Sequence, residues 1–380
     1  MSVLSGIDRV ETLDALLSSG RLGLLTNPSG LTRSLIPTVD VLNRKYRLSA
    51  LFAAEHGIRR NIQAGETFSA AQDPATGLPV FPLYGKTRVL TEEMLETFDI
   101  FCFDMQDVGA RFYTFLYALS LNMEACCRAG KPVVVFDRIN PLGGEKIQGT
   151  VLDPRFSSYV GLYPLPTRYG LTIGEYARWV KHHLGLEDLE LRVVPLEGWR
   201  RGMRPEEADL PWPAPSPNCP TFHSARTYVG TCIFEGTNLS EGRGTCMPFE
   251  YIGAPWIDAD RLAAVAESRA VPGIRFRPHW FTPCASWYAG EACAGVQVHL
   301  TDPDAADPVA GALALLDSVR ELYPEKLEWV ANTPGRYMID LLLGTDDYRL
   351  GRMDGPTLLA AHKEARRRFA KERQPFLLYD

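Results

Sequence analysis

The sequence lacks the features that mark nucleic-acid-binding and membrane-spanning proteins. Its 40 lysine and arginine residues are outnumbered by 46 aspartate and glutamate residues, which gives a net charge of −6. The longest basic run is Arg366-Arg367-Arg368, and it stands near Glu364 in a pattern typical of a solvated helix face. No apolar stretch approaches the roughly 20 residues that a membrane-spanning helix needs. We therefore expect neither a nucleic acid nor a membrane as a partner.

The eight cysteines form no CxxC pair and show no metal-ligand spacing with histidine. Most of them stand in apolar stretches, where a thiol behaves as a small buried hydrophobic group. This usage favours a reduced, intracellular protein and predicts no metal site. The first nine residues hold no basic segment followed by an apolar one, so we expect no export signal and a cytoplasmic location.

Several common catalytic and cofactor-binding motifs are also missing. No GxGxxG opens a helix, which argues against a dinucleotide-dependent oxidoreductase. There is no GxSxG nucleophile elbow and no HExxH zinc motif. The segment Tyr84-Gly85-Lys86-Thr87 is no phosphate-binding loop, because Val80 stands where that motif requires its first glycine. We therefore predict that the protein uses no cofactor.

Short apolar runs alternate with helical patterns over the first two thirds of the chain. The strand-like runs cover residues 22–26, 48–54, 100–104, 133–136 and 189–194. Apolar residues at helical spacing separate them at about 38–44, 90–98, 112–126 and 173–184. This alternation predicts right-handed βαβ units and an α/β fold with a Rossmann-like, doubly wound, mostly parallel sheet.

The length of 380 residues favours two domains rather than one. Five prolines between Pro211 and Pro220 mark a structured connector or an active-site loop. Beyond them, helices are expected at about 260–269, 312–322 and 356–372, and strands at 274–277 and 295–300. We predict a Rossmann-like domain over residues 1–254 and a smaller α+β domain over residues 255–380.

Polar residues follow three of the predicted strands at the point where each strand ends. They are Glu55 and His56 after the second strand, Gln106, Asp107, Arg111 and Tyr113 after the third, and Asp137, Arg138 and Asn140 after the fourth. In an open α/β sheet, ligands bind outside the carboxyl ends of the strands. One such residue usually caps a helix or a loop, but three clusters at equivalent ends favour a functional site.

A second polar stretch covers residues 234–245 and contains three glycines within nine residues. Asn238, Glu241 and Arg243 supply an amide and charges, and the glycines allow close backbone approach to a ligand. Two interpretations stay open. The stretch is either a capping loop in which Glu241 pairs with Arg243, or a binding loop that closes over the same strand ends.

The candidate site is rich in carboxylates and poor in nucleophiles and metal ligands. Its acidic residues are Glu55, Asp104, Asp107, Asp137, Glu235 and Glu241. Glycosidic-bond hydrolysis needs one protonated carboxyl for the leaving oxygen and a second carboxylate at the sugar. We predict Glu55 as the general acid/base, because partial desolvation at a strand end raises a carboxyl pKa. Asp107 and Glu241 are the candidates for the second carboxylate.

Taken together, these clusters resemble the exo-β-N-acetylmuramidases of peptidoglycan recycling, a family long catalogued as a domain of unknown function. The resembling segments are LLTNPSG at 24–30, EHG at 55–57, DMQDVGARFY at 104–113, DRINP at 137–141, EGTNLSEGRGT at 235–245 and GVQVH at 295–299. The resemblance implies a Rossmann-like larger domain, a smaller C-terminal domain and an active site in the cleft between them. It also implies release of N-acetylmuramic acid from the non-reducing ends of peptidoglycan fragments.

On this hypothesis the ligand is a small carbohydrate derived from muropeptides. The predicted substrate-binding residues are His56, Gln106, Arg111, Tyr113, Asp137, Arg138, Asn140, Asn238 and Arg243. The lactyl carboxylate of N-acetylmuramic acid calls for an arginine, and Arg243 is favoured slightly over Arg111, whereas Arg138 is expected to pair internally. Two alternatives stay open, namely a non-catalytic module that binds amino sugars or nucleotides and a hydrolase for a different amino sugar.

Overall fold

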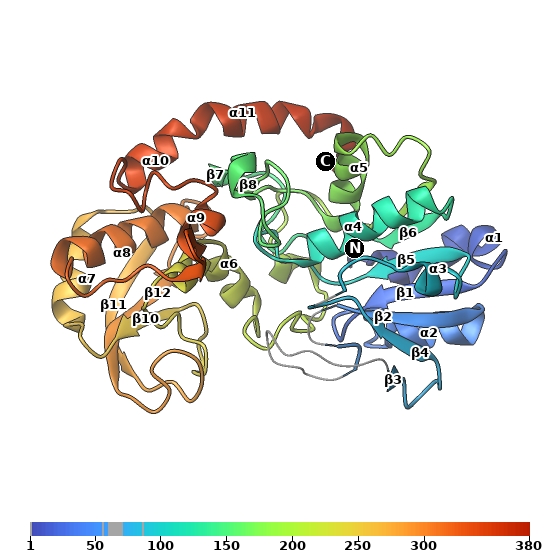
Figure 1. The fold of residues 1–380 in the computed structure, drawn as a ribbon, viewed down its shortest axis with the longest axis horizontal. Helices are drawn as coiled ribbons and strands as arrows, with labels where there is room; N and C mark the ends of the chain where they lie inside the picture. The colour runs from blue at the N-terminus through green and yellow to red at the C-terminus, as the bar shows by residue number, and fades with distance from the viewer. Residues whose placement is uncertain (1, 55–56, 60–70, 86) are drawn as a thin grey trace.

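The computed structural model describes residues 2–54, 57–59, 71–85 and 87–380. Glu55 and His56, two residues of the predicted site, therefore lie outside the described residues. The described chain forms a larger unit from its N-terminal part and a smaller unit from its C-terminal part, and the two lie side by side (Figure 1).

Within the described residues, the larger unit is built on a seven-stranded sheet. Its strand order is β3 (Ala71–Gln72), β4 (Pro79–Pro82), β2 (Leu48–Ala53), β1 (Leu22–Thr26), β5 (Ile100–Asp104), β6 (Val133–Phe136) and β9 (Leu191–Val194). The six described strands from β4 to β9 run parallel, and β3 is antiparallel to β4 at the edge. The order reverses between β1 and β5, which is the topology of a doubly wound Rossmann-like sheet. This part of the predicted fold is confirmed.

Helices cover both faces of this sheet, because its strands are apolar on both sides. One face carries α3 (Glu92–Leu95), α4 (Phe115–Arg128) and α5 (Ile173–His183). The other carries the 3₁₀ helix η1 (Gly6–Leu13), α1 (Asp14–Leu17) and α2 (Thr38–Lys45). Neighbouring residues of one strand lie on opposite faces of the sheet. In β1, Leu25 belongs to the apolar core beneath α3, α4 and α5, and Leu24 belongs to the core beneath η1, α1 and α2.

The smaller unit contains, within the described chain, a three-stranded antiparallel sheet. Its order is β10 (Tyr251–Ala254), β12 (Cys293–Leu300) and β11 (Ile274–Phe281). The helices α7 (Ala259–Ser268) and α8 (Pro308–Leu322) share one apolar core with these strands. The helix α6 (Phe222–Thr231) packs against α8 and lies between the two units (Figure 1). The predicted smaller α+β domain is confirmed as well.

The two units meet earlier in the sequence than the predicted boundary. The four residues of β10 lie inside the range 1–254 predicted for the first domain, but their pairing with β12 joins them to the smaller sheet. The buried side chains of Ile233, Phe234 and Leu239 also belong to the core of the smaller unit. We therefore propose that the smaller unit begins at α6.

Short elements complete the structure. The paired strands β7 (Gln148–Val151) and β8 (Pro166–Arg168) extend the larger unit, and β13 (Ala331–Thr333) pairs with β14 (Arg336–Tyr337). The remaining 3₁₀ helices are η2 (Pro154–Phe156), η3 (Pro205–Ala208), η4 (Cys232–Gly236) and η5 (Gln374–Phe376). No helix in the described ranges is both long and apolar enough to cross a membrane.

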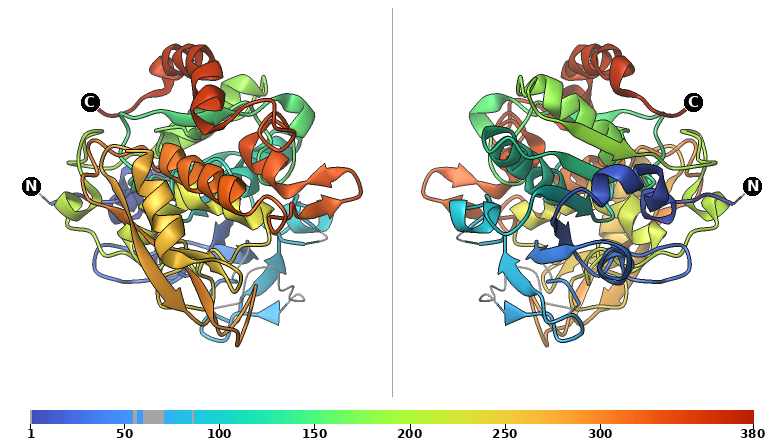
Figure 2. Two further views of the ribbon diagram at one scale, coloured as in Figure 1. Left: turned by 90° about the vertical axis from the view of Figure 1, so that its left-hand side faces the viewer. Right: turned by 90° about the vertical axis from the view of Figure 1, so that its right-hand side faces the viewer.

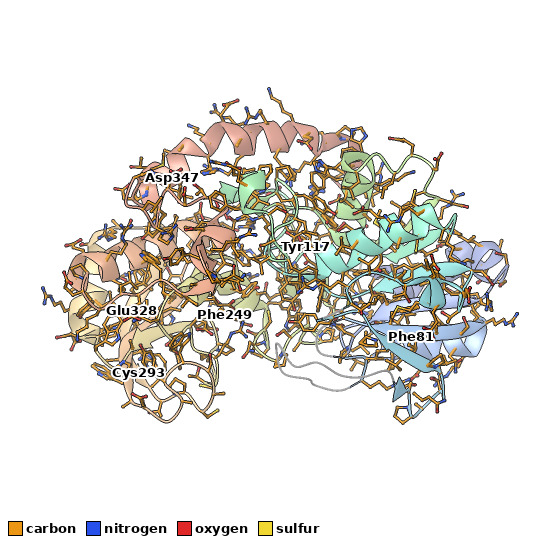
Figure 3. All side chains as sticks on the ribbon, viewed as in Figure 1. Phe81, Tyr117, Phe249, Cys293, Glu328 and Asp347 are labelled. Atoms are coloured by element: carbon orange, nitrogen blue, oxygen red, sulfur yellow. The ribbon has the colours of Figure 1, made fainter. Side chains whose placement is uncertain are left out.

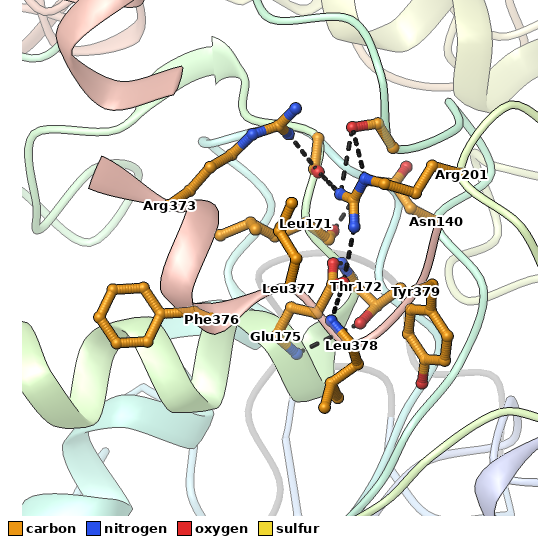
Figure 4. A network of polar contacts seen from close by, with 12 residues as sticks. Asn140, Leu171, Thr172, Glu175, Arg201, Arg373, Phe376, Leu377, Leu378 and Tyr379 are labelled. Carbon is orange, nitrogen blue, oxygen red and sulfur yellow. Dashed lines mark hydrogen bonds and ion pairs between the residues drawn. The ribbon is translucent and has the colours of Figure 1, made fainter. Parts of the chain in front are cut away.

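The chain returns to the larger unit at its end. The helices α9 (Met338–Leu343) and α10 (Gly355–Ala361) belong to the smaller unit. The next helix, α11 (Lys363–Glu372), crosses between the units on the outside of the molecule (Figures 1 and 2). Residues 373–380, here called the C-terminal strap, then bind the larger unit. The main-chain N–H of Leu378 donates to Glu175 of α5 at 2.8 Å (Figure 4).

Candidate active site

The carboxyl ends of β1 and β5 form the switch point of the sheet, where nucleotides bind in many folds of this type. Asp104 ends β5 and is fully buried, and Arg138 forms an ion pair with it, with 2.5 Å from Nε to Oδ1. The proline-rich segment also reaches this point, because Asn27 Nδ2 donates to the carbonyl of Pro215 at 3.4 Å. Asp104 and Arg138 thus satisfy each other's charge inside the protein. The internal pair expected for Arg138 forms with Asp104.

Asp137, after β6, is bonded on all sides by protein donors. It accepts hydrogen bonds from Gly174 N and Thr172 Oγ1, both at 2.7 Å, and from the hydroxyl of Tyr379. Burial raises the pKa of this carboxyl to about 7. The side chain therefore joins the start of α5 to the C-terminal strap, and its oxygens are not directed at a ligand.

The amide side chains of the strand-end clusters also serve the fold. Gln106 Nε2 donates to the carbonyls of Asp107 and Ile139, at 2.7 and 2.8 Å. Asn140 Nδ2 donates to the carbonyl of Leu171 at 2.8 Å, and its Oδ1 accepts a main-chain N–H two residues on. Both residues are almost fully buried. Their polar groups form hydrogen bonds with main-chain groups of the loops that follow the strands.

Arg111 is fully buried and connects the two units. Its guanidinium donates to the carbonyls of Thr150, Leu165 and Leu342, at 3.1, 3.0 and 2.5 Å. Leu342 belongs to α9 of the smaller unit, whereas the other two carbonyls belong to the larger one. Burial lowers the pKa of Arg111 to about 10. This geometry gives Arg111 a structural role, so its guanidinium is not available to bind the carboxylate of a ligand.

Asp107 is buried, with 4% of its surface exposed. Its Oδ2 accepts a hydrogen bond from Gly109 N at 2.7 Å and another from the hydroxyl of Tyr169. Its Oδ1 has no hydrogen-bond partner among the described residues. Burial raises the pKa of the carboxyl to about 6. Asp107 is not among the residues that line the cavity described next.

A cavity of about 410 Å³ lies between the two units. The larger unit lines it with Phe112, Tyr113, Tyr159, Asn218 and Cys219, and the smaller unit with Glu235, Arg243, Phe249 and Met338. Figure 3 labels Phe249 on the side of the smaller unit that faces the larger one. The volume falls in the range of small-ligand sites, which are mostly apolar with a few polar groups that orient the ligand.

Three charged side chains form a cluster at the cavity, here called the Glu–Arg–Glu cluster. Arg243 Nε lies 2.8 Å from Glu241 Oε1, and its Nη2 forms an ion pair with Glu235. The guanidinium also lies over the ring of Phe249, 5.0 Å from its centroid. The Glu241 side chain is 3% exposed and that of Glu235 is 27% exposed. Glu235 therefore faces the cavity, and Glu241 lies behind Arg243.

Electrostatics distinguish the members of this cluster. Burial, together with the nearby charge of Glu235, raises the pKa of Glu241 to about 7 despite its contact with Arg243. Burial acts to lower the pKa of Arg243, but the two carboxylates outweigh it and raise that pKa. The described residues contain no group of three or more His, Cys, Asp and Glu side chains arranged to hold a metal ion. A carboxyl whose pKa is about 7, as in Glu241, can gain or lose a proton near neutral pH.

Local backbone geometry brings the cluster together. The short helix η4 carries Glu235, and the chain then turns back at Gly242, whose φ is 81°. A side chain at that position would be strained and its Cβ would lie 2.8 Å from the carbonyl oxygen of Tyr251. Both interpretations of residues 234–245 are therefore partly realised, since the Glu241–Arg243 pair forms and the loop also lines the cavity.

Asn238 and Tyr113 occupy different places relative to this cavity. Asn238 Nδ2 donates to the carbonyl of Lys326 at 2.9 Å and its Oδ1 accepts the N–H of Glu328, so the amide anchors its own loop. Tyr113 lines the cavity, and its ring packs edge-on against Phe115 at 4.7 Å. Of the predicted site residues that the structure describes, only Tyr113 and Arg243 line this cavity.

Two charged lining residues were given no role in the sequence analysis. Glu235 was counted among the acidic residues of the candidate site, but neither catalysis nor binding was assigned to it. Arg88 lies with its guanidinium over the Tyr159 ring, 4.0 Å from the centroid, and both residues line the cavity. The carboxylate-rich stretch 234–245 could have identified Glu235, whereas no feature of the sequence singles out Arg88.

A Rossmann-like sheet, a smaller α+β unit and a carboxylate-lined cavity between them define a two-domain α/β protein with a site for a polar ligand. Residues 22–223 match the N-terminal model, and residues 226–379 the C-terminal model, of exo-beta-N-acetylmuramidase NamZ. The chain belongs to this family. It is 42% identical over 368 residues to peptidoglycan beta-N-acetylmuramidase NamZ of Bacillus subtilis (strain 168), covering 96% of this chain and 88% of that protein.

Solved structures share the complete architecture. A crystal structure of a DUF1343 family protein from Bacteroides fragilis aligns with a TM-score of 0.90 at 32% identity, over 100% of this chain and 99% of that one. A second DUF1343 family protein from the same organism aligns with a TM-score of 0.76 at 27% identity, with the same coverage. The resemblance inferred from the sequence motifs is thus confirmed at the level of family and fold.

Proposed function

We propose that the chain is an exo-β-N-acetylmuramidase that releases N-acetylmuramic acid from the non-reducing end of peptidoglycan fragments such as MurNAc-GlcNAc. The observation that carries this proposal is the Glu–Arg–Glu cluster on the wall of the interdomain cavity. Membership of the NamZ family supports the same reaction. On this proposal the cavity receives the terminal sugar, with the rings of Tyr113 and Phe249 at its walls.

Hydrolysis needs two carboxyl groups with different tasks. One donates a proton to the departing glycosidic oxygen, and the other acts on the sugar or on the attacking water. We propose Glu55 as the acid/base, as expected from the sequence, because it stands two residues after the buried strand β2 in the chain. For the second carboxylate we propose Glu235 ahead of Asp107 and Glu241, because Glu235 lines the cavity, whereas the other two are buried and do not line it.

Glu241 then acts through Arg243. Its carboxyl holds the guanidinium from the buried side, so that Arg243 stays against Glu235 and over the Phe249 ring. A carboxyl with a pKa of about 7 also changes its charge near neutral pH, which alters the net charge of the cluster. We propose Glu241 as a positioning residue for Arg243 and Glu235.

For the lactyl carboxylate of N-acetylmuramic acid we propose Arg88 ahead of Arg243. Arg243 already faces two carboxylates, so an incoming anion would meet their negative charge. Arg88 forms no ion pair within the described part of the chain, and stacking on Tyr159 orients its guanidinium at the cavity lining. The planar guanidinium can donate two parallel hydrogen bonds to one carboxylate.

A set of chromogenic glycosides tests the proposed function. We expect hydrolysis of 4-nitrophenyl β-N-acetylmuramide, and mass spectrometry of a MurNAc-GlcNAc digest should show free N-acetylmuramic acid. Equal or better hydrolysis of the β-N-acetylglucosaminide would favour a different amino sugar as substrate. Saturable binding of the disaccharide without release of either sugar would instead identify a non-catalytic sugar-binding protein.

A further inference from the structure

A groove of about 1200 Å³ adjoins the interdomain cavity. The two are neighbours, because Asn218 and Arg243 line both. We infer that this groove binds the part of a peptidoglycan fragment that leaves on cleavage, starting with the amino sugar next to the terminal N-acetylmuramic acid. This inference rests on the proposed function and adds to it a second binding site.

Three aromatic side chains of the smaller sheet line the groove. The rings of Tyr251 and His279 lie 4.1 Å apart, and Phe281 lies 5.6 Å from Tyr251 with its plane 11° from that of His279. His279 and Phe281 alternate along β11 with Trp280, which does not line the groove. Aromatic faces pack well against the C–H faces of sugar rings, because both surfaces are flat and apolar. This surface therefore has the chemistry of a sugar-binding platform.

The position of the Glu–Arg–Glu cluster fits this occupant. An exo-acting glycosidase cuts one bond, which must lie between the site for the terminal sugar and the site for the rest of the substrate. Arg243 lies where the cavity joins the groove, and Glu235 is paired with it. A fragment that spans both spaces thus places its first glycosidic bond beside a carboxylate that reaches the cavity.

The groove is part of the folded smaller unit rather than a gap between loose loops. Residues 244–246 and residues 281, 282 and 284–286 contribute to its lining. Their main chains are bonded to each other, because Cys284 N donates to the carbonyl of Gly244 at 2.9 Å. Gly244 has a φ of 75°, and a Cβ there would lie 2.4 Å from Ala285 N, so the close approach requires glycine.

Kinetics with a short and a long substrate test the inference. The chromogenic muramide offers only a nitrophenyl group to the groove, whereas MurNAc-GlcNAc and longer fragments offer sugars. In His279→Ala and Phe281→Ala, we expect the kcat/KM ratio of the longer substrate over the chromogenic one to fall by roughly tenfold, as is common when an aromatic contact is truncated. Trp280→Ala is the matched control on the same strand, because its side chain is 60% exposed outside the groove.

The groove also carries two exposed thiols, Cys246 and Cys284. A bulky maleimide on these thiols should block turnover of the longer substrate far more than that of the chromogenic muramide. The double variant Cys246→Ser/Cys284→Ser should be resistant to the reagent. Mass spectrometry of the labelled protein shows whether both thiols have reacted.

Each result has a defined meaning. A kcat/KM ratio unchanged in His279→Ala and Phe281→Ala, or lowered equally in Trp280→Ala, would overturn the groove assignment while leaving the proposed activity intact. Full turnover of the longer substrate by the doubly labelled protein would do the same. If the unmodified protein cleaves neither substrate, the proposed function is wrong, and the inference about what binds in the groove is wrong as well.

Discussion

The members of the Glu–Arg–Glu cluster differ in function because they differ in exposure. Glu235 reaches the cavity, whereas Glu241 is shielded from it by Arg243. Removing the carboxylate from Glu235 changes the groups that face the ligand. Removing it from Glu241 leaves Arg243 with one partner fewer, so its effect reaches the ligand only through Arg243.

Substituting the two proposed catalytic carboxylates should stop turnover without unfolding the protein. We expect Glu235→Gln and Glu55→Gln each to lower kcat on the chromogenic muramide by about 10²–10⁴-fold, the range for loss of an acid/base group. Thermal unfolding checks that the fold is kept. Near-normal turnover by either variant would remove that residue from the catalytic pair.

Selectivity for the lactyl group should depend on Arg88. A hydrogen bond to a charged group contributes about 1.5–3 kcal/mol, so Arg88→Ala should lower kcat/KM on the muramide by roughly ten- to a hundredfold. The corresponding β-N-acetylglucosaminide lacks the carboxylate, and its turnover should change much less. Arg243→Ala, which disrupts the cluster, should impair both substrates alike. If Arg243→Ala instead lowers kcat/KM on the muramide but not on the glucosaminide, Arg243 is the residue that binds the lactyl group.

The raised pKa of Glu241 predicts a pH-dependent stability. Burial keeps this carboxyl protonated in the folded protein up to about pH 7, whereas in the unfolded chain it ionises near its ordinary value of 4.5. The folded state therefore loses stability relative to the unfolded state as pH rises from about 4.5 to about 7.

Thermal unfolding between pH 5 and pH 8 measures this contribution. We expect Glu241→Gln to show a smaller decrease in Tm over this range than the unmodified protein. Asp153→Asn serves as the control, because its partner Arg155 lowers the pKa of that carboxyl and its titration lies below this range. An identical pH dependence in Glu241→Gln and the unmodified protein would contradict the assigned burial effect.

At the scale of elements, buried parallel strands were the most predictable feature. The runs 22–26, 100–104 and 133–136 coincide with β1, β5 and β6, because a continuous apolar run of this length fits a strand covered on both faces. The helix expected at about 90–98 is also present in part as α3, and Thr91 caps it, since its hydroxyl accepts the N–H of Met94 at 3.3 Å. The short pairs β7–β8 and β13–β14 were not predicted, because they depend on partners distant in space rather than on local pattern.

The candidate site was less predictable than the fold. The clusters after β5 and β6 do lie at one edge of the sheet, but Asp137, Asn140 and Gln106 form hydrogen bonds with main-chain and hydroxyl groups of the protein. A buried strand end leaves many polar backbone groups to satisfy, and these side chains satisfy them. Residue type and spacing do not reveal which polar group faces a ligand. That depends on where the smaller unit places Glu235 and Arg243.

At the scale of the whole molecule, the site depends on how the two units are held together. The cavity and the groove both take residues from each unit, so a small displacement between the units would separate their walls. Arg111 bonds a carbonyl of α9 from the larger unit, and α11 crosses from the smaller unit to the strap. Interdomain contacts outside the cavity lining therefore support the geometry of the site.

The strap predicts a measurable link between stability and activity. The Tyr379 hydroxyl donates to Asp137 and accepts the N–H of Leu196 at 2.9 Å, and the strap's Arg373 donates to the carbonyl of Tyr169 at 3.0 Å. Tyr379→Phe leaves the N–H of Leu196 without this partner, at a cost of about 1–3 kcal/mol, and removes one of several donors to Asp137. We expect a lower free energy of unfolding in urea, with only a modest change in kcat at low temperature.

Removal of residues 373–380 should have a larger effect than Tyr379→Phe, because it releases α11 from the larger unit. Urea unfolding followed by tryptophan fluorescence should then show two separate transitions where the intact chain shows one, since each unit has its own apolar core. The truncated protein should also lose activity at urea concentrations below its first transition, as the walls of the cavity separate before either core melts. A single transition with activity retained up to it would show that Arg111 and the cavity contacts hold the units together without the strap.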